Sequence, residues 1–221
     1  MASISISAPM EMGLKIVTPK RQIYAAMTKA IAFELSGRMK ALEKEIVALV
    51  ANKLEESIRA NSTADALING NLKTELGVVD PSLALDQIIT AVKVGVKITR
   101  SGFTAGTTSI KGGFRLVAIR SSFSDLLDLD IAEYISEKGH DIPWLRWLLL
   151  EGRKPVVSDY KIQFDRPKKS RTNDAIMRMH GSSSWGVPAE HAGDSEKNFI
   201  TESIEGLRGP IETLVRQRLQ P

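Results

Sequence analysis

The stretch that decides the fold is Lys20–Ala60, KRQIYAAMTKAIAFELSGRMKALEKEIVALVANKLEESIRA, which contains no proline and a single glycine, Gly37. Apolar residues recur in it at steps of three and four, the spacing that lines up side chains on one face of an α-helix. The pattern predicts one amphipathic helix about 60 Å long, which a break at Gly37 would shorten. Such a helix must bury its far end against a second layer of the chain or against a partner. Its predicted apolar face comprises Met27, Ile31, Leu35, Met39, Leu42, Ile46, Leu49, Lys53 or Leu54, and Ile58.

Residues 1–19, before this helix, mix small and apolar side chains. The alternation of Ile4 and Ile6 predicts an extended N-terminal arm that adds a strand to a neighbouring molecule, although a frayed terminus explains the same residues equally well. After the helix, Asn61–Thr63 and Asp80–Ser82 are typical helix starts. They predict two further helices, ending near residues 77 and 89.

The apolar period changes at Ala91. Alternating valines and an isoleucine over 92–98 predict a half-buried strand, and Phe114, Leu116 and Ala118 predict a second one. The Gly-, Thr- and Ser-rich residues 102–113 between them predict a long, mobile hairpin loop.

Later segments complete an α+β pattern. Residues 143–151 predict a compact apolar helix and 156–164 a third strand, whereas 165–195 are polar and loop-like with one short strand near 175–179. We therefore expect a long N-terminal amphipathic helix and further helices packed on a small, mostly antiparallel β-sheet, with long extended loops. The predicted single domain, 20–221, divides into a helical part at about 20–90, sheet and loops at about 91–195, and a C-terminal helix at about 196–219, kinked or restarted at Gly209–Pro210.

Composition is that of a folded protein, with 43% hydrophobic and 25% charged residues. The net charge of +4 is too low for a dedicated DNA-binding domain of this length. The absence of cysteine excludes disulfides, thiol nucleophiles and cysteine-based metal sites. No apolar run is long enough to span a bilayer, and residues 1–8 lack the features of a secretory signal, so we expect synthesis in the cytoplasm and no membrane partner.

Several near-matches to catalytic motifs are incomplete. Residues 102–113 place Lys111 where a phosphate-binding loop requires its second glycine, and 181–186 lack glycines two positions either side of a serine. The histidines lie 40 and 11 residues apart, without short metal-binding spacings, and the acidic residues near Asp128 lack the glycine and glutamate of a calcium loop. The sequence predicts no enzyme, no cofactor and no metal site.

Contacts with other molecules are the expected role of the loops and the arm. A basic stretch, 153–178, predicts a solvated surface, a surface that contacts another subunit, or one that contacts nucleic-acid phosphates. The candidate contact residues are Ile4, Ile6, Phe103, Lys111, Arg166, Lys168, Lys169, Arg171 and Trp185.

Residues 142–207 carry a family resemblance. Ile142-Pro143-Trp144-Leu145, Leu148–Gly152, Ser170–Thr172, Trp185–Gly193 and Asn198–Thr201 together resemble the neck or tail-completion proteins of tailed bacteriophages, which join the head's portal to the tail. The resemblance implies a virion protein that forms a ring of identical subunits around the DNA channel. It also implies portal-side and tail-side protein partners, and passing contact with genomic DNA.

Two other functions compete with this expectation. Within the same class, a tail terminator that caps the tail tube has similar features. In a different class, a basic DNA-binding accessory protein would also use the 153–178 stretch. Ring stoichiometry and the partner of each loop are not encoded in any recognisable motif.

Overall fold

The long helix predicted at the start of the chain is present in the computed structural model as α1 (Arg21–Arg59), 39 residues without interruption. Gly37 does not break it. The predicted apolar face is confirmed at most positions from Leu35 to Ile58. It is wrong at Met27, which is exposed, because Thr28 and Ala32 form the buried stripe at that end. The buried positions are Thr28, Ala32, Leu35, Met39, Leu42, Ile46, Val50, Leu54 and Ile58.

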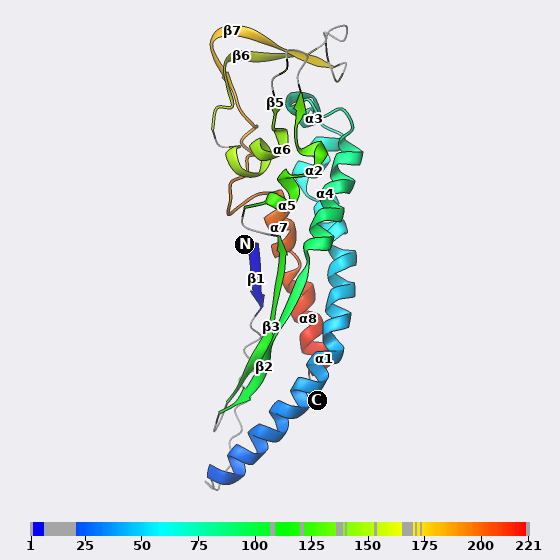
Figure 1. The fold of residues 1–221 in the computed structure, drawn as a ribbon, viewed down its shortest axis with the longest axis vertical. Helices are drawn as coiled ribbons and strands as arrows, with labels where there is room; N and C mark the ends of the chain where they lie inside the picture. The colour runs from blue at the N-terminus through cyan, green and yellow to red at the C-terminus, as the bar shows by residue number, and fades with distance from the viewer. Residues whose placement is uncertain are drawn as a thin grey trace.

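The molecule is elongated, with α1 along much of its length (Figure 1). The structure describes residues 2–6, 21–106, 109–119, 122–135, 139, 141–152, 154–164, 170, 172 and 174–219. Helices and small antiparallel sheets make it an α+β fold, as expected. The strands in the described ranges form three separate sheets, where the sequence suggested one.

Three helices follow α1: α2 (Ser62–Ile68), α3 (Leu72–Leu76) and α4 (Pro81–Gly95). The side chain of Asp80 caps α4 by accepting from the Leu83 amide at 2.9 Å. The prediction of a strand from Ala91 is wrong, because α4 continues to Gly95. Val92 extends the helical series of buried residues through Leu85 and Ile88, and this burial outweighs the local alternation of valines.

The largest sheet has the strand order β1–β3–β2 and is antiparallel throughout. It consists of β1 (Ala2–Ile6), β2 (Lys97–Ala105) and β3 (Ile110–Ile119). Residues 102–113 are therefore mostly strand, and the prediction of a long loop there is wrong. Phe103 and Ile110 pack against the core, an apolar anchorage that the Gly-, Thr- and Ser-rich composition concealed.

The middle of the chain forms a compact region below the upper end of the molecule in Figure 1, and we call this region the central cluster. After α5 (Ser124–Leu127), a 3-10 turn (Asp130–Ala132) leads to the short strand pair β4 (Tyr134–Ile135) and β5 (Asp141–Ile142). The predicted apolar helix is confirmed as α6 (Trp144–Arg146) followed by the π-helical turn η2 (Trp147–Glu151). Trp144 is fully buried, and its indole N–H donates to the backbone oxygen of Ile131.

The strands β6 (Val157–Phe164) and β7 (Ala175–Trp185) form a two-stranded sheet among the described residues and cross the upper end of the molecule (Figure 1). We call this pair the upper ribbon. β6 confirms the third predicted strand, but β7 is longer than the short strand expected within 165–195. Its length escaped prediction because the polar run at its end has no apolar alternation.

The C-terminal region consists of two helices, α7 (Phe199–Glu205) and α8 (Arg208–Leu219), with the break before Arg208 and not at Gly209–Pro210. Both lie along α1 (Figure 1). The Ser57 hydroxyl donates to the backbone oxygen of Ser203 at 2.9 Å, which joins α1 to α7.

Candidate interaction surfaces

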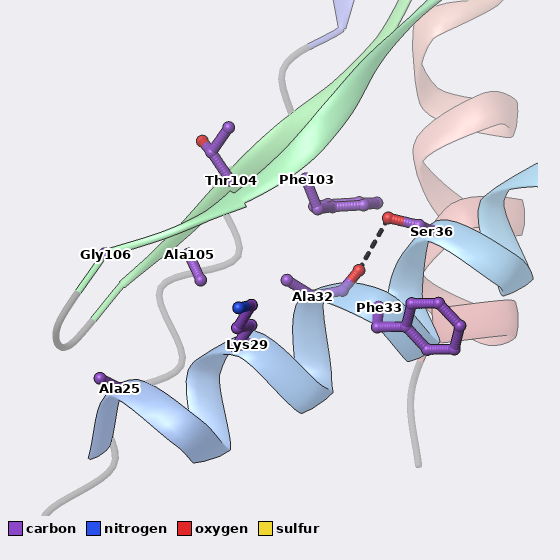
Figure 2. Close-up of a pocket in the computed structure, with 9 residues that line it drawn as sticks. All are labelled: Ala25, Lys29, Ala32, Phe33, Ser36, Phe103, Thr104, Ala105 and Gly106. Atoms are coloured by element: carbon purple, nitrogen blue, oxygen red, sulfur yellow. Dashed lines mark hydrogen bonds between the residues drawn. The ribbon is translucent and has the colours of Figure 1, made fainter. Parts of the chain in front are cut away.

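A groove lies between the first turns of α1 and the far end of β2 (Figure 2). Its volume is about 730 Å³. The buried Thr28 fastens the two walls together, because its hydroxyl donates to the Gly106 backbone oxygen at 2.9 Å. Phe33, at the rim, is 83% exposed. The groove is lined by Ala25, Lys29, Ala32, Phe33, Ser36, Phe103, Thr104, Ala105 and Gly106.

Two of the predicted contact residues, Phe103 and Lys111, lie on the hairpin formed by β2 and β3. Phe103 forms part of the groove wall, and its ring covers Gly112, where an added Cβ would come within 2.4 Å of the ring. Phe103 thus packs within its own chain as well as facing the groove. Lys111, on β3, is exposed to solvent.

The predicted arm residues Ile4 and Ile6 lie on β1, whose backbone pairs with β3 of the same chain. Ile4 is opposite Leu116, and Ile6 is opposite Phe114. The strand conformation expected of this segment is therefore present, with a strand partner inside the chain. Addition to a neighbouring molecule stays a prediction.

Three of the segments that carry the family resemblance, residues 142–152, 185–193 and 198–201, meet in the central cluster. Gly152 and Gly193 lie close together, since a Cβ on Gly152 would come within 2.8 Å of the Gly193 backbone nitrogen. A Cβ on Gly193 would come within 2.6 Å of the Leu148 backbone oxygen. Asn198 is buried; its side chain caps α7 and also donates to the backbone oxygen of Leu149 at 3.3 Å. Residues 148–152 and 193–198 are thereby locked to each other.

Trp185, another predicted contact residue, also packs against the central cluster. Its ring meets that of Trp147 edge-on, with centroids 6.1 Å apart and planes at 66°, a favourable aromatic geometry. Trp185 is half-buried and attaches one end of the upper ribbon to the body.

The predicted basic contacts Arg166, Lys168, Lys169 and Arg171 lie outside the described residues. The structure brings together a different basic pair from the same stretch: Lys161 of β6 lies directly opposite Arg178 of β7, and both are exposed. Sequence reasoning did not select this pair, because the strand register across a ten-residue connection has no local signal.

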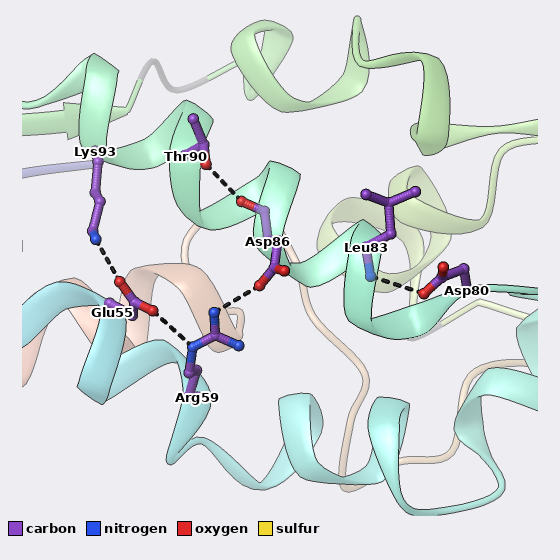
Figure 3. A network of polar contacts seen from close by, with 7 residues as sticks. All are labelled: Glu55, Arg59, Asp80, Leu83, Asp86, Thr90 and Lys93. Carbon is purple, nitrogen blue, oxygen red and sulfur yellow. Dashed lines mark hydrogen bonds and ion pairs between the residues drawn. The ribbon is translucent and has the colours of Figure 1, made fainter.

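An ionic network joins α1 to α4 (Figure 3). Glu55 accepts from Lys93 at 2.5 Å and from Arg59 at 3.0 Å, while Arg59 also donates to Asp86 at 2.6 Å. These partners, Lys93 foremost, lower the pKa of the Glu55 carboxyl, and Asp86 is the main cause of the raised pKa of Arg59. Every member has an opposite charge as partner, so the network fixes two helices and has no unpaired group for chemistry.

The His180 imidazole lies 3.3 Å from the Ser183 hydroxyl, at an exposed bulge of β7. That hydroxyl also donates to the His180 backbone oxygen at 2.8 Å, which makes the contact a local turn. In the part of the chain that the structure describes, no third group orients the imidazole, and no cluster of three His, Asp or Glu residues is placed to hold a metal ion. None of the described helices is long and apolar enough to cross a bilayer.

These features define an elongated α+β protein whose distinctive surfaces lie at its two ends. No family model, no curated protein and no solved structure matches this chain. Its surfaces and its internal packing therefore carry the functional argument.

Proposed function

We propose that this chain is a structural virion protein of a tailed bacteriophage, a ring-forming neck or tail-completion component that joins the head to the tail around the DNA channel. In this role it acts by packing against copies of itself and against portal-side and tail-side proteins. It catalyses no reaction, and genomic DNA passes through the ring.

The observation that carries the proposal is the exposure of large apolar side chains along an elongated subunit. Phe33 near the lower end is 83% exposed, Met179 on the upper ribbon 74% and Ile135 on β4 72%. Large apolar residues spread over both ends of a molecule are typical of a protein that is covered by partners. An elongated subunit with contacts at both ends suits a connection between two larger structures.

Ring formation follows from the same arrangement. Identical subunits that use two different surfaces make head-to-tail contacts, and these close into a ring when the rotation per subunit allows it. Three of the segments that carry the family resemblance meet in the central cluster. This supports a structural role for them, because Gly152, Gly193 and Asn198 are all engaged in internal packing.

Two measurements test the proposal. Light scattering after size exclusion, with negative-stain imaging, is expected to show rings with an axial hole. An electron-microscopy map of the intact particle is expected to place the chain between portal and tail, whereas a position at the end of the tail tube would identify a tail terminator. A monomer that is absent from the particle would contradict the proposal.

A DNA-binding accessory protein is the second candidate, favoured by the opposed Lys161 and Arg178. It predicts tight binding of duplex DNA at physiological salt, with affinity falling steeply as salt rises. Fluorescence anisotropy with a labelled duplex measures this directly. For the ring protein we expect only weak binding without sequence preference.

A further inference from the structure

Two neighbouring segments of the chain carry opposite charge. Residues 122–142 contain six acidic residues and one lysine, a net charge of −5. Residues 153–180 contain eight basic and three acidic residues, a net charge of +5. The apolar helical segment α6–η2 separates them. An asymmetry of this size within sixty residues is a strong electrostatic feature for a chain of net charge +4.

The negative segment forms an exposed surface around β4 and β5. Its described carboxylates at the surface belong to Asp128, Asp130, Glu133 and Asp141. Ile135, which is 72% exposed, lies directly opposite Asp141 in the β4–β5 pair and two residues after Glu133. We call these five residues the acidic surface. Among the described residues, none of the four carboxylates forms an ion pair. The acidic surface therefore combines carboxylates that form no ion pair with another described residue and an exposed apolar side chain.

The described part of the positive segment includes β6 and the first half of β7, and this part of the upper ribbon has one basic face. Lys161 and Arg178 are directly opposite each other on β6 and β7, and Ile176 lies on the same face two residues before Arg178. Like charges placed directly across a strand pair destabilise it. Neither cation meets a carboxylate in the described part of the chain. The basic face thus mirrors the acidic surface in charge and also contains an isoleucine.

Within one chain the ribbon is fixed to the body near both of its ends. The ribbon is attached at one end by Trp185 against Trp147, and near the other end the Thr74 hydroxyl donates to Asp174 at 3.2 Å. The ribbon crosses the long axis of the molecule, and β5 lies on the body below it (Figure 1). A ribbon in this orientation extends sideways, toward a copy that stands alongside in a ring.

We propose that the basic face of the ribbon docks on the acidic surface of a neighbouring copy of this chain. Lys161 and Arg178 then pair with the neighbour's carboxylates, and Ile176 covers its Ile135. The inference rests on the proposed ring function and names the contact that closes the ring. A second copy suits the site better than nucleic acid because both surfaces carry an exposed or half-exposed isoleucine, which phosphates would leave uncovered.

Charge reversal tests the contact. The ribbon variant K161E/R178E and the acidic-surface variant E133K/D141K are each expected to lower the self-association constant about a hundredfold, measured by sedimentation velocity. Mixing the two variants restores opposite charges at every contact between unlike variants and is expected to restore association between them. The matched control, K40E/K44E, makes the same change of charge as the ribbon variant at two exposed positions of α1 and is expected to assemble as the wild type does.

Each other outcome overturns the proposal in a recognisable way. Assembly of the ribbon variant at wild-type strength removes the contact but leaves the ring. Restoration in a single chain that carries all four changes, but not in the mixture, identifies contact within one copy. Loss of duplex-DNA binding by the ribbon variant with unchanged assembly identifies a phosphate surface. A chain absent from the particle refutes the proposed function independently of these results.

Discussion

The two hairpins of this protein have similar lengths but opposite surroundings. The lower hairpin, β2–β3, gains a third strand from β1, lies against α1, and buries Phe114, Leu116 and Ala118. The upper ribbon, β6–β7, has no third strand among the described residues. Of its described side chains, Trp185 alone packs against the main core.

A two-stranded ribbon is only marginally stable by itself in water, because it needs a third strand or a helix to cover one face. The lower hairpin has that cover inside the chain. The upper ribbon leaves Met177 and Met179 exposed on one face and two cations on the other. The difference indicates that the lower hairpin contributes more to the stability of the monomer than the upper ribbon does, and it agrees with the proposed contact between the ribbon and a neighbouring copy.

The sharpest test of this comparison truncates one apolar residue in each hairpin. Leu116→Ala removes a fully buried side chain of β3 and is expected to cost about 2–5 kcal/mol. Ile162→Ala, on half-exposed β6, is expected to cost less than about 1 kcal/mol in the isolated chain. Urea denaturation of both variants measures the difference. Equal losses would show that the upper ribbon is part of the monomer's core.

A smaller effect is expected from adding one methyl group to a glycine in each hairpin. At Gly112 the new Cβ would lie 2.4 Å from the Phe103 ring and 2.8 Å from its Cα, so Gly112→Ala is expected to destabilise by about 1–3 kcal/mol. Gly181→Ala, on β7, meets no atom within 4 Å and serves as the matched control, with a change of about 0.5 kcal/mol or less. Thermal unfolding followed by circular dichroism would report both, and a larger loss at Gly181 would reverse the comparison.

The attachment of the lower hairpin to α1 is expected to contribute less. Thr28→Val removes the hydrogen bond to Gly106, worth about 1 kcal/mol. Amide exchange should rise around residues 103–106 and stay unchanged on the upper ribbon. Thr90→Val is the control, since its hydroxyl bonds only within α4, to the Asp86 backbone oxygen. Uniform acceleration over the whole chain would argue against a local attachment.

The smallest expected effect concerns pH near the connection of the upper ribbon, where Thr74 contacts Asp174. Burial raises the pKa of the neighbouring Glu75 carboxyl, and Glu190 raises it further. The folded state therefore holds this proton more tightly than the unfolded state, so the ionised carboxyl costs stability above the unfolded pKa of about 4.3.

We expect Glu75→Gln to stabilise the protein at pH 7 by a few tenths of a kcal/mol, because water screens the half-exposed carboxyl. The gain should disappear as the pH falls below about 4, where Glu75 is protonated in both states. Melting temperatures of both proteins at several pH values provide the measurement. A gain that grows toward acid pH would assign the wrong sign to the shift.

Much of the helical architecture was predictable because a single period dominates it. The stripe from Leu35 to Ile58 has one face, no proline and no competing pattern. The start of β2 was not predictable, because Val92 fits a strand alternation and also the buried face of α4. In such a segment the surrounding packing decides, and that information is absent from a local window.

For the candidate contacts, the sequence indicates the type of surface but not which residues lie together. It predicts a basic surface within 153–178, but the pairing of Lys161 with Arg178 depends on a strand register between residues far apart in sequence. Phe103 was predicted in a loop because its neighbours are Gly, Thr and Ser, although its ring packs against Gly112. Local sequence patterns therefore predicted the long helix, whereas contacts between strands far apart in sequence could not be predicted from them.

The unbroken length of α1 has a consequence for spacing. Thirty-nine residues at about 1.5 Å per residue span about 58 Å, from the groove beside Thr28 to the charged network at Arg59. An α-helix resists compression along its axis, because its backbone hydrogen bonds run in that direction. In an assembly with one layer at each end of the subunit, α1 acts as a molecular ruler that sets the distance between those layers.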